Sequence, residues 1–181
     1  MITDVSNYTL YELASARDQE VSLCRYQYYD SEFNEGYVLC SESFYFFIRV
    51  RTQVIEEEHE VYFLVMKDFH NCEINDAFTF TPIYTGILRD VILFKSKKEL
   101  ELSKLRKKEV TTETSLLLEF EDNERFLIYP QSGLFSNTCF LRGTDRILET
   151  IWKEKLYQSR LVKKDEGLLK SLEQYESLHA S

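Results

Sequence analysis

Alternating apolar and polar residues predict that most of this chain forms β-strands. Residues 20–29 and 36–41 carry β-branched and aromatic residues, which strands prefer, with a period of two. The turn signal Asn34-Glu35-Gly36 separates these two segments. The sequence therefore predicts two successive strands near the N-terminus.

Two hairpins have the clearest pattern. The first lies near 44–66, where one face of the first strand is formed by Phe44, Phe46, Ile48 and Val50. Its tip, 55–60, holds four glutamates, and we expect it to be solvated because burying an unpaired carboxylate costs several kcal/mol. The second hairpin covers 114–130 and turns at 121–124. Both hairpins predict antiparallel pairing.

The segments between the hairpins are less regular. Residues 71–85 indicate an ordered loop or an edge strand, because Pro82 cannot donate a hydrogen bond to a sheet. Residues 86–95 are apolar on much of both faces, which favours a central strand. Residues 95–109 are rich in Lys, Arg and Glu and fit neither period, so we interpret them as a solvated loop or helix face.

Helical periodicity occurs at both ends of the chain. Residues 6–18 predict a short helix, and Thr9 and Glu12 have the spacing of a capping box. Near the C-terminus, Thr144 or Asp145 is the expected N-cap of a further helix. A second C-terminal helix is expected over 165–179. The helix that begins near Thr144 has an apolar stripe, which we expect to be buried. The stripe is formed by Ile147, Leu148, Ile151, Trp152 and Leu156.

The predicted fold class is α+β. It combines a mainly antiparallel sheet of about six to eight strands, with hairpins near 44–66 and 114–130, and two C-terminal helices packed on the sheet. The 181 residues contain no repeat and no low-complexity linker. We therefore expect one domain over 1–181, sheet-rich over 20–130 and helical over 144–179.

Net charge and cysteine content indicate which partners and which cellular compartment to expect. The net charge of −9 opposes long-range attraction to nucleic acid and to anionic membranes, so neither is expected as a partner. No run approaches the ~20 apolar residues of a membrane span, and the first residues lack the pattern of a secretory signal. Four cysteines without a closely spaced pair favour free thiols in a reducing compartment. We expect a cytoplasmic protein.

One segment has the residue types of a catalytic site. In Asp68-Phe69-His70-Asn71-Cys72, Asp68 would orient His70, and His70 would activate Cys72 as a nucleophile. Catalytic groups usually come together from distant segments, so we favour an ordinary loop. The chain has no phosphate-binding loop and no nucleophile elbow. We predict no catalytic residue, no metal ligand and no cofactor.

Two charged segments are candidates for binding. Glu56, Glu57, Glu58 and Glu60 are the predicted partner-binding residues, because clustered carboxylates speed the encounter with a basic protein. They do not have the spacing of a calcium loop. The basic segment 95–109 lacks interleaved aromatic residues, so it does not predict a single-strand RNA site.

These features favour a small acidic protein that sequesters a partner protein without chemistry. Bacterial immunity proteins and antitoxins share this general character, although no motif of theirs is present. Two alternatives stay open. One is an enzyme with a dispersed small-molecule pocket, and the other is a structural subunit of a phage or secretion assembly, in which the aromatic strand 44–50 buries its second face. Homo-oligomers are compatible with the last alternative.

Overall fold

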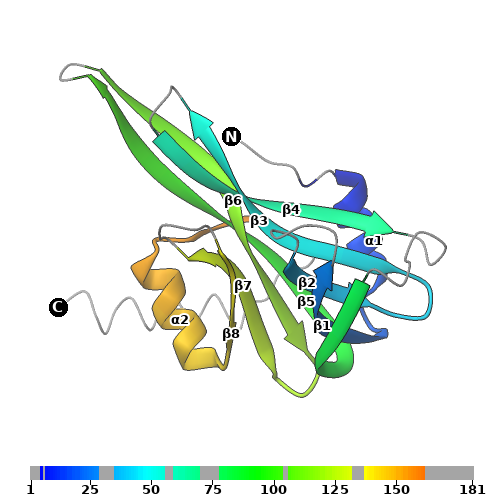
Figure 1. Cartoon of the computed structure of the whole chain (residues 1–181). Helices are drawn as coiled ribbons and strands as arrows, with labels where there is room; N and C mark the ends of the chain where they lie inside the picture. Colours follow the sequence, from blue (N-terminus) through cyan, green and yellow to red (C-terminus); the bar gives the residue numbers. More distant parts are fainter. Residues whose placement is uncertain are drawn as a thin grey trace.

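A computed structural model of the chain describes residues 5, 7–28, 35–55, 59–69, 78–103, 106–131 and 137–161. These residues form one nine-stranded sheet and two helices, α1 (Asn7–Ser15) and α2 (Thr144–Lys153) (Figure 1). The strands are β1 (Glu20–Tyr28), β2 (Glu35–Cys40), β3 (Tyr45–Ile55), β4 (His59–Phe69), β5 (Phe78–Ser103), β6 (Arg106–Phe120), β7 (Arg125–Gln131), β8 (Asn137–Arg142) and β9 (Tyr157–Leu161).

All strand pairs are antiparallel, and the strand order is β4-β3-β2-β1-β5-β6-β7-β8. The 26-residue strand β5 is the link between two halves of this sheet. Its first part, up to Ile87, pairs with β1, and its remainder pairs with β6. The last described strand, β9, pairs with β5 from Ile92 to Lys95. Residues 86–95 are thus central, as predicted.

The two halves pack their inner faces together to form the main core. Strands β1–β4 contribute Leu23, Leu39, Ile48 and Leu64 to this core, and the opposite half contributes Leu93, Leu116, Leu118, Phe126 and Ile128. The edge strand β8 also contacts the first half of the sheet. The Val50 N–H of β3 donates to Thr138 Oγ1 at 2.9 Å, and the Tyr37 ring of β2 stacks on Phe140 with centroids 5.6 Å apart. The bent sheet therefore encloses a continuous apolar interior.

Helix α1 packs against this interior through Leu13, and both Leu13 and Ala16, which directly follows the helix, are fully buried in the main core. The chain after it is tied to β5, because the Asp18 N–H donates to the Leu88 carbonyl at 2.8 Å. The prediction of a short N-terminal helix is confirmed. The predicted cap is wrong, since the helix begins at Asn7 and Thr9 lies buried within its first turn.

Helix α2 covers the outer face of the second half of the sheet. Its buried residues Ile147, Leu148 and Ile151 form a cluster with sheet residues such as Leu117 and Leu127. Trp152 is 39% exposed, so its predicted place in the core is wrong; it lies at the margin of the helical stripe. The N-cap is Gly143, whose φ of 98° favours glycine, rather than Thr144 or Asp145.

The structure corrects the predicted fold in three further ways. The described residues contain nine strands rather than six to eight, because β8 and β9 have no clear alternation in the sequence. Among the described residues one C-terminal helix, α2, is present in place of the predicted two, and the range of the other, 165–179, lies outside them. The basic segment 95–109 is neither loop nor helix: its described part forms the ends of β5 and β6.

Aromatic rings cover the outer face of the first half of the sheet. Tyr26 crosses over Gly36 to contact Phe47 edge-on, with ring centroids 4.8 Å apart. Phe47 also packs against Phe78 and Phe80 of β5, at 5.2 and 6.2 Å. The second face of strand 44–50 is therefore occupied by rings of the same chain. This removes the need for an assembly partner that the sequence suggested.

We predict that Gly36→Ala destabilises the protein. A Cβ at this position would lie 2.6 Å from the Ile48 carbonyl oxygen and 2.9 Å from the Tyr26 ring, so backbone and ring must both shift. The expected loss of unfolding free energy is ~1–3 kcal/mol, measured by urea denaturation. Thr81→Ala, on an exposed position of β5, is the control and should change it by less than ~0.5 kcal/mol. Equal midpoints for the two variants would contradict the close packing at Gly36.

Candidate partner-binding site

The ends of β5 and β6 project from the body as a two-stranded arm, which we define as residues 95–103 and 106–113 (Figure 1). The β3–β4 hairpin lies against this arm. A small apolar cluster of Val61, Leu100 and Val110 fills the contact. His59 Nε2 donates to the Glu101 carbonyl at 3.1 Å, and Lys98 Nζ donates to the Glu60 carbonyl at 2.8 Å. We call this region the arm junction.

Charged residues form ion pairs between diagonal positions of the two arm strands, and each lysine contacts one carboxylate of the directly opposed Glu99 and Glu109. Lys97 pairs with Glu109 at 3.2 Å, and Lys107 pairs with Glu99 at 2.5 Å. Cross-strand pairs of opposite charge favour strand pairing, each by a fraction of a kcal/mol. These pairs explain why the segment folds as strands although its sequence lacks an apolar alternation.

The structure places one of the four predicted partner-binding residues. Glu60 lies at the start of β4 with its side chain exposed, and Glu56, Glu57 and Glu58 lie outside the described residues. Directly across from Glu60 in the strand pair is Val54, whose side chain is 57% exposed. The described end of the hairpin thus presents an acidic and an apolar side chain beside Lys98 of the arm.

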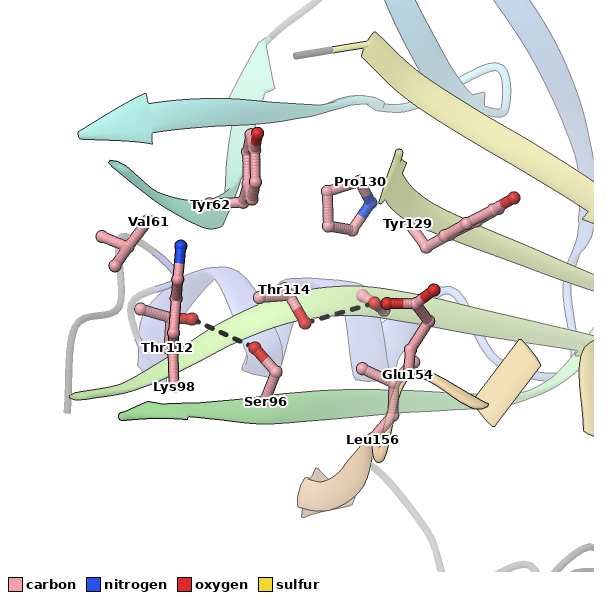
Figure 2. A pocket seen from close by; sticks show the side chains of 11 residues that line it. Val61, Tyr62, Ser96, Lys98, Thr112, Thr114, Tyr129, Pro130, Glu154 and Leu156 are labelled. Carbon is pink, nitrogen blue, oxygen red and sulfur yellow. Dashed lines mark hydrogen bonds between the residues drawn. The ribbon is translucent and has the colours of Figure 1, made fainter. Parts of the chain in front are cut away.

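A pocket of about 90 Å³ opens at the arm junction (Figure 2). Its wall is rich in hydroxyl groups, supplied by Ser96, Thr112, Thr114, Ser115, Tyr62 and Tyr129. Ser96 and Thr112 are linked by a hydrogen bond of 3.4 Å, and Thr114 and Ser115 by one of 3.3 Å. Lys98 lies at one end of the pocket and Glu154 at the other.

The pocket is suited to a small polar group. Its volume is below the ~150 Å³ cavity that accommodates benzene, and its hydroxyls both donate and accept hydrogen bonds. Burial raises the pKa of Tyr129, with smaller contributions from Cys139 and Glu154, so this phenol stays protonated at neutral pH. The pocket hydroxyls could bind a small group by hydrogen bonds, and Lys98 and Glu154 place one positive and one negative charge nearby.

The acidic turn at 121–124 is engaged within the chain. The Tyr84 hydroxyl donates to the Asp122 carboxylate, and Arg142 binds Glu124 with two hydrogen bonds of 2.8 and 2.9 Å. The bond from Tyr84 lowers the pKa of Asp122, and Arg142 lowers the pKa of Glu124. Both carboxylates therefore have internal partners, unlike the exposed side chain of Glu60.

The other candidate chemistry gains no support from the part of the chain that the structure describes. His70 and Cys72 lie outside it, as does the side chain of Asp68. Within the described residues, no cluster of His, Cys, Asp and Glu has the geometry to hold a metal ion. Neither described helix is long and apolar enough to cross a membrane.

No protein family matches this chain, and neither does any curated protein or solved structure. The site is therefore described from its own geometry. Sequence reasoning missed the pocket because its walls come from five separate segments, in β4, β5, β6, β7 and after α2, and its hydroxyl groups belong to ordinary Ser, Thr and Tyr residues. The available signal is the set of Thr and Ser residues at 111–115 of β6, whose position beside β4 the sequence does not show.

We predict that Asp122→Asn lowers the pKa of Tyr84. The hydrogen bond to the Asp122 carboxylate, together with burial and that negative charge, raises the pKa of Tyr84 to about 12. Removing the charge favours the phenolate, so the pKa should move toward the ordinary value near ~10. The measurement is an NMR pH titration with ¹³C-labelled tyrosine. Glu121→Gln, at the exposed neighbouring position, should leave the value in place, and an unchanged pKa in Asp122→Asn would contradict the assigned bond.

Proposed function

We propose that the protein binds and sequesters a partner protein through the arm junction, without chemistry, as small inhibitors of the immunity-protein or antitoxin type do. The observation that carries this proposal is the exposed Val54 directly opposite the exposed Glu60 on a projecting hairpin. An apolar contact surrounded by charged groups is the usual composition of a protein–protein interface. The hydroxyl-lined pocket beside it would accept one polar side chain of the partner.

Electrostatics favours a basic partner. The whole chain carries a net charge of −9, and Glu56, Glu57, Glu58 and Glu60 gather four carboxylates at one tip. Lys98 lies next to Glu60 and offsets part of this local charge. The negative electrostatic field that remains at the tip would increase the association rate more than the affinity. Added salt would screen this field and reduce its effect.

We predict that replacing these four glutamates by glutamine slows association with the partner. The partner is first captured from host lysate on the immobilised chain, and stopped-flow mixing then measures its association rate at several salt concentrations. We expect the rate at low salt to fall about tenfold and its salt dependence to flatten.

A variant matched in net charge provides the control. Glu12→Gln, Asp18→Asn, Glu20→Gln and Asp145→Asn also remove four carboxylates, but from α1, the turn after it, the start of β1 and the start of α2. This variant should keep most of the association rate. Equal losses in the two variants would show that total charge, rather than the hairpin tip, attracts the partner. Unchanged kinetics in both variants would contradict electrostatic steering.

A second candidate function is the binding of a small polar molecule in the pocket. Three neighbouring β6 hydroxyls, from Thr112, Thr114 and Ser115, are buried in the pocket wall, and Lys98 and Glu154 supply opposite charges at its two ends. This set would suit a molecule that carries both an anionic and a cationic group. An enzyme or a ligand-binding protein would use such a site.

We predict that Thr114→Val weakens binding of such a molecule about fivefold, because one hydrogen bond is lost at nearly constant side-chain volume. The probes are free α-amino acids, tested by ligand-detected NMR. Thr111→Val is the matched control, since residue 111 precedes a pocket residue on the same strand and points to the other face. Absence of binding by every amino acid, or equal effects of both variants, would rule out this candidate.

A further inference from the structure

Two cysteines far apart in the sequence lie side by side on the outer face of the sheet. Cys24 is on β1 and Cys40 on β2, and in the strand register Cys40 is opposite Ser22 while Cys24 is opposite Val38. They are therefore diagonal neighbours on one face. Both belong to the cluster that contains Val38 and Phe47.

As diagonal neighbours in one cluster, the two cysteine side chains lie next to each other on the outer face of the sheet. The Cys40 Sγ also lies 3.5 Å from the Ser22 carbonyl oxygen, which holds its side chain over β1. Cys24 is buried and Cys40 is half-buried, so a small reagent can reach the pair from the side of Cys40. A disulfide has ~2 Å between its sulfurs and usually ~4.4–6.8 Å between its Cα atoms, slightly less than the ~7–8 Å of diagonal cross-strand neighbours, so β1 and β2 must move together by about 1 Å to close the bond.

We propose that Cys24 and Cys40 form a reversible disulfide when the protein meets a peroxide. The site is a modification site on the sheet, separate from the arm junction, and it does not depend on the proposed partner binding. The third described cysteine, Cys139 on β8, is absent from the cluster that holds this pair.

The chemistry balances with hydrogen peroxide as the oxidant. The Cys24 thiolate attacks one peroxide oxygen, the O–O bond breaks, and Cys24 becomes a sulfenic acid. The hydroxide that leaves takes up the proton lost by the Cys24 thiol and becomes the first water. The Cys40 thiol then attacks this sulfur, the S–S bond forms, and the hydroxyl of the sulfenic acid takes the remaining proton and leaves as the second water. The hydrogen bond from Cys40 lowers the pKa of Cys24 and raises the pKa of Cys40, which agrees with this order.

The test treats the reduced full chain with one equivalent of hydrogen peroxide. Denatured protein is then assayed for free thiols and digested for mass spectrometry without reductant. We expect the four thiols of the chain to fall to two, and one linked peptide pair to contain Cys24 and Cys40. Dithiothreitol should restore all four. Oxidation without this linked pair, or a linked pair that involves Cys72 or Cys139 in its place, would overturn the proposal.

Two variants separate this pair from general thiol oxidation. Cys139→Ser should still lose two thiols and form the same linked pair. Cys40→Ser should form no intramolecular disulfide at Cys24, and a sulfenic-acid reagent should label Cys24 instead.

In the wild-type protein, oxidation closes a loop between β1 and β2 and should raise the melting temperature by ~5 °C. An equal rise in oxidised Cys40→Ser would show that another modification causes the stabilisation.

Discussion

Strand β5 has to satisfy backbone hydrogen bonds in both halves of the sheet, and the rest of the fold follows from this requirement. Up to Ile87 its partner is β1, and from Leu88 onward its partner is β6. The strand can serve both only by bending, so the two halves turn their inner faces toward each other and enclose the core. At the change of partner, the Leu88 N–H donates to the Gln19 carbonyl, which prevents an unpaired buried amide.

The same strand explains why the arm junction exists. Beyond Lys95, the described part of β5 pairs with β6 alone, because its pairing with β9 ends at Lys95. Before Leu116, β6 is likewise not paired with β7. An isolated two-stranded ribbon is marginally stable in water. The β3–β4 hairpin supplies the missing support through Val61 and the bonds from His59 and Lys98. The pocket is the space left where these supports meet β7 and the end of α2.

The sequence predicts those elements whose pattern of apolar and polar residues follows from local structure alone. Apolar strand runs separated by short polar turns made the strands and pairing of the hairpins 44–66 and 114–130 predictable, although neighbouring elements bury both faces of these strands in the body of the protein. The arm was not, because its strands are held by cross-strand ion pairs such as Lys97–Glu109, which leave no apolar alternation. The pocket also escaped prediction, since it depends on how β5 bends. Pro82, Gly86 and the register shifts beside them mark an irregular strand, but they do not give the direction of the bend.

The two acidic turns look equivalent in the sequence, and the structure distinguishes them by what lies across the neighbouring strands. At 121–124, Tyr84 and Arg142 bind Asp122 and Glu124, and the Arg142 guanidinium also lies 5.6 Å from the Phe126 ring centroid. These carboxylates stabilise the body of the protein. At the other turn, Lys98 binds the Glu60 backbone carbonyl, which fixes the hairpin on the arm while the carboxylate stays exposed. The Lys98 ammonium binds a backbone carbonyl and not the neighbouring carboxylate, and this difference between the two turns supports the proposal of partner binding at the hairpin tip.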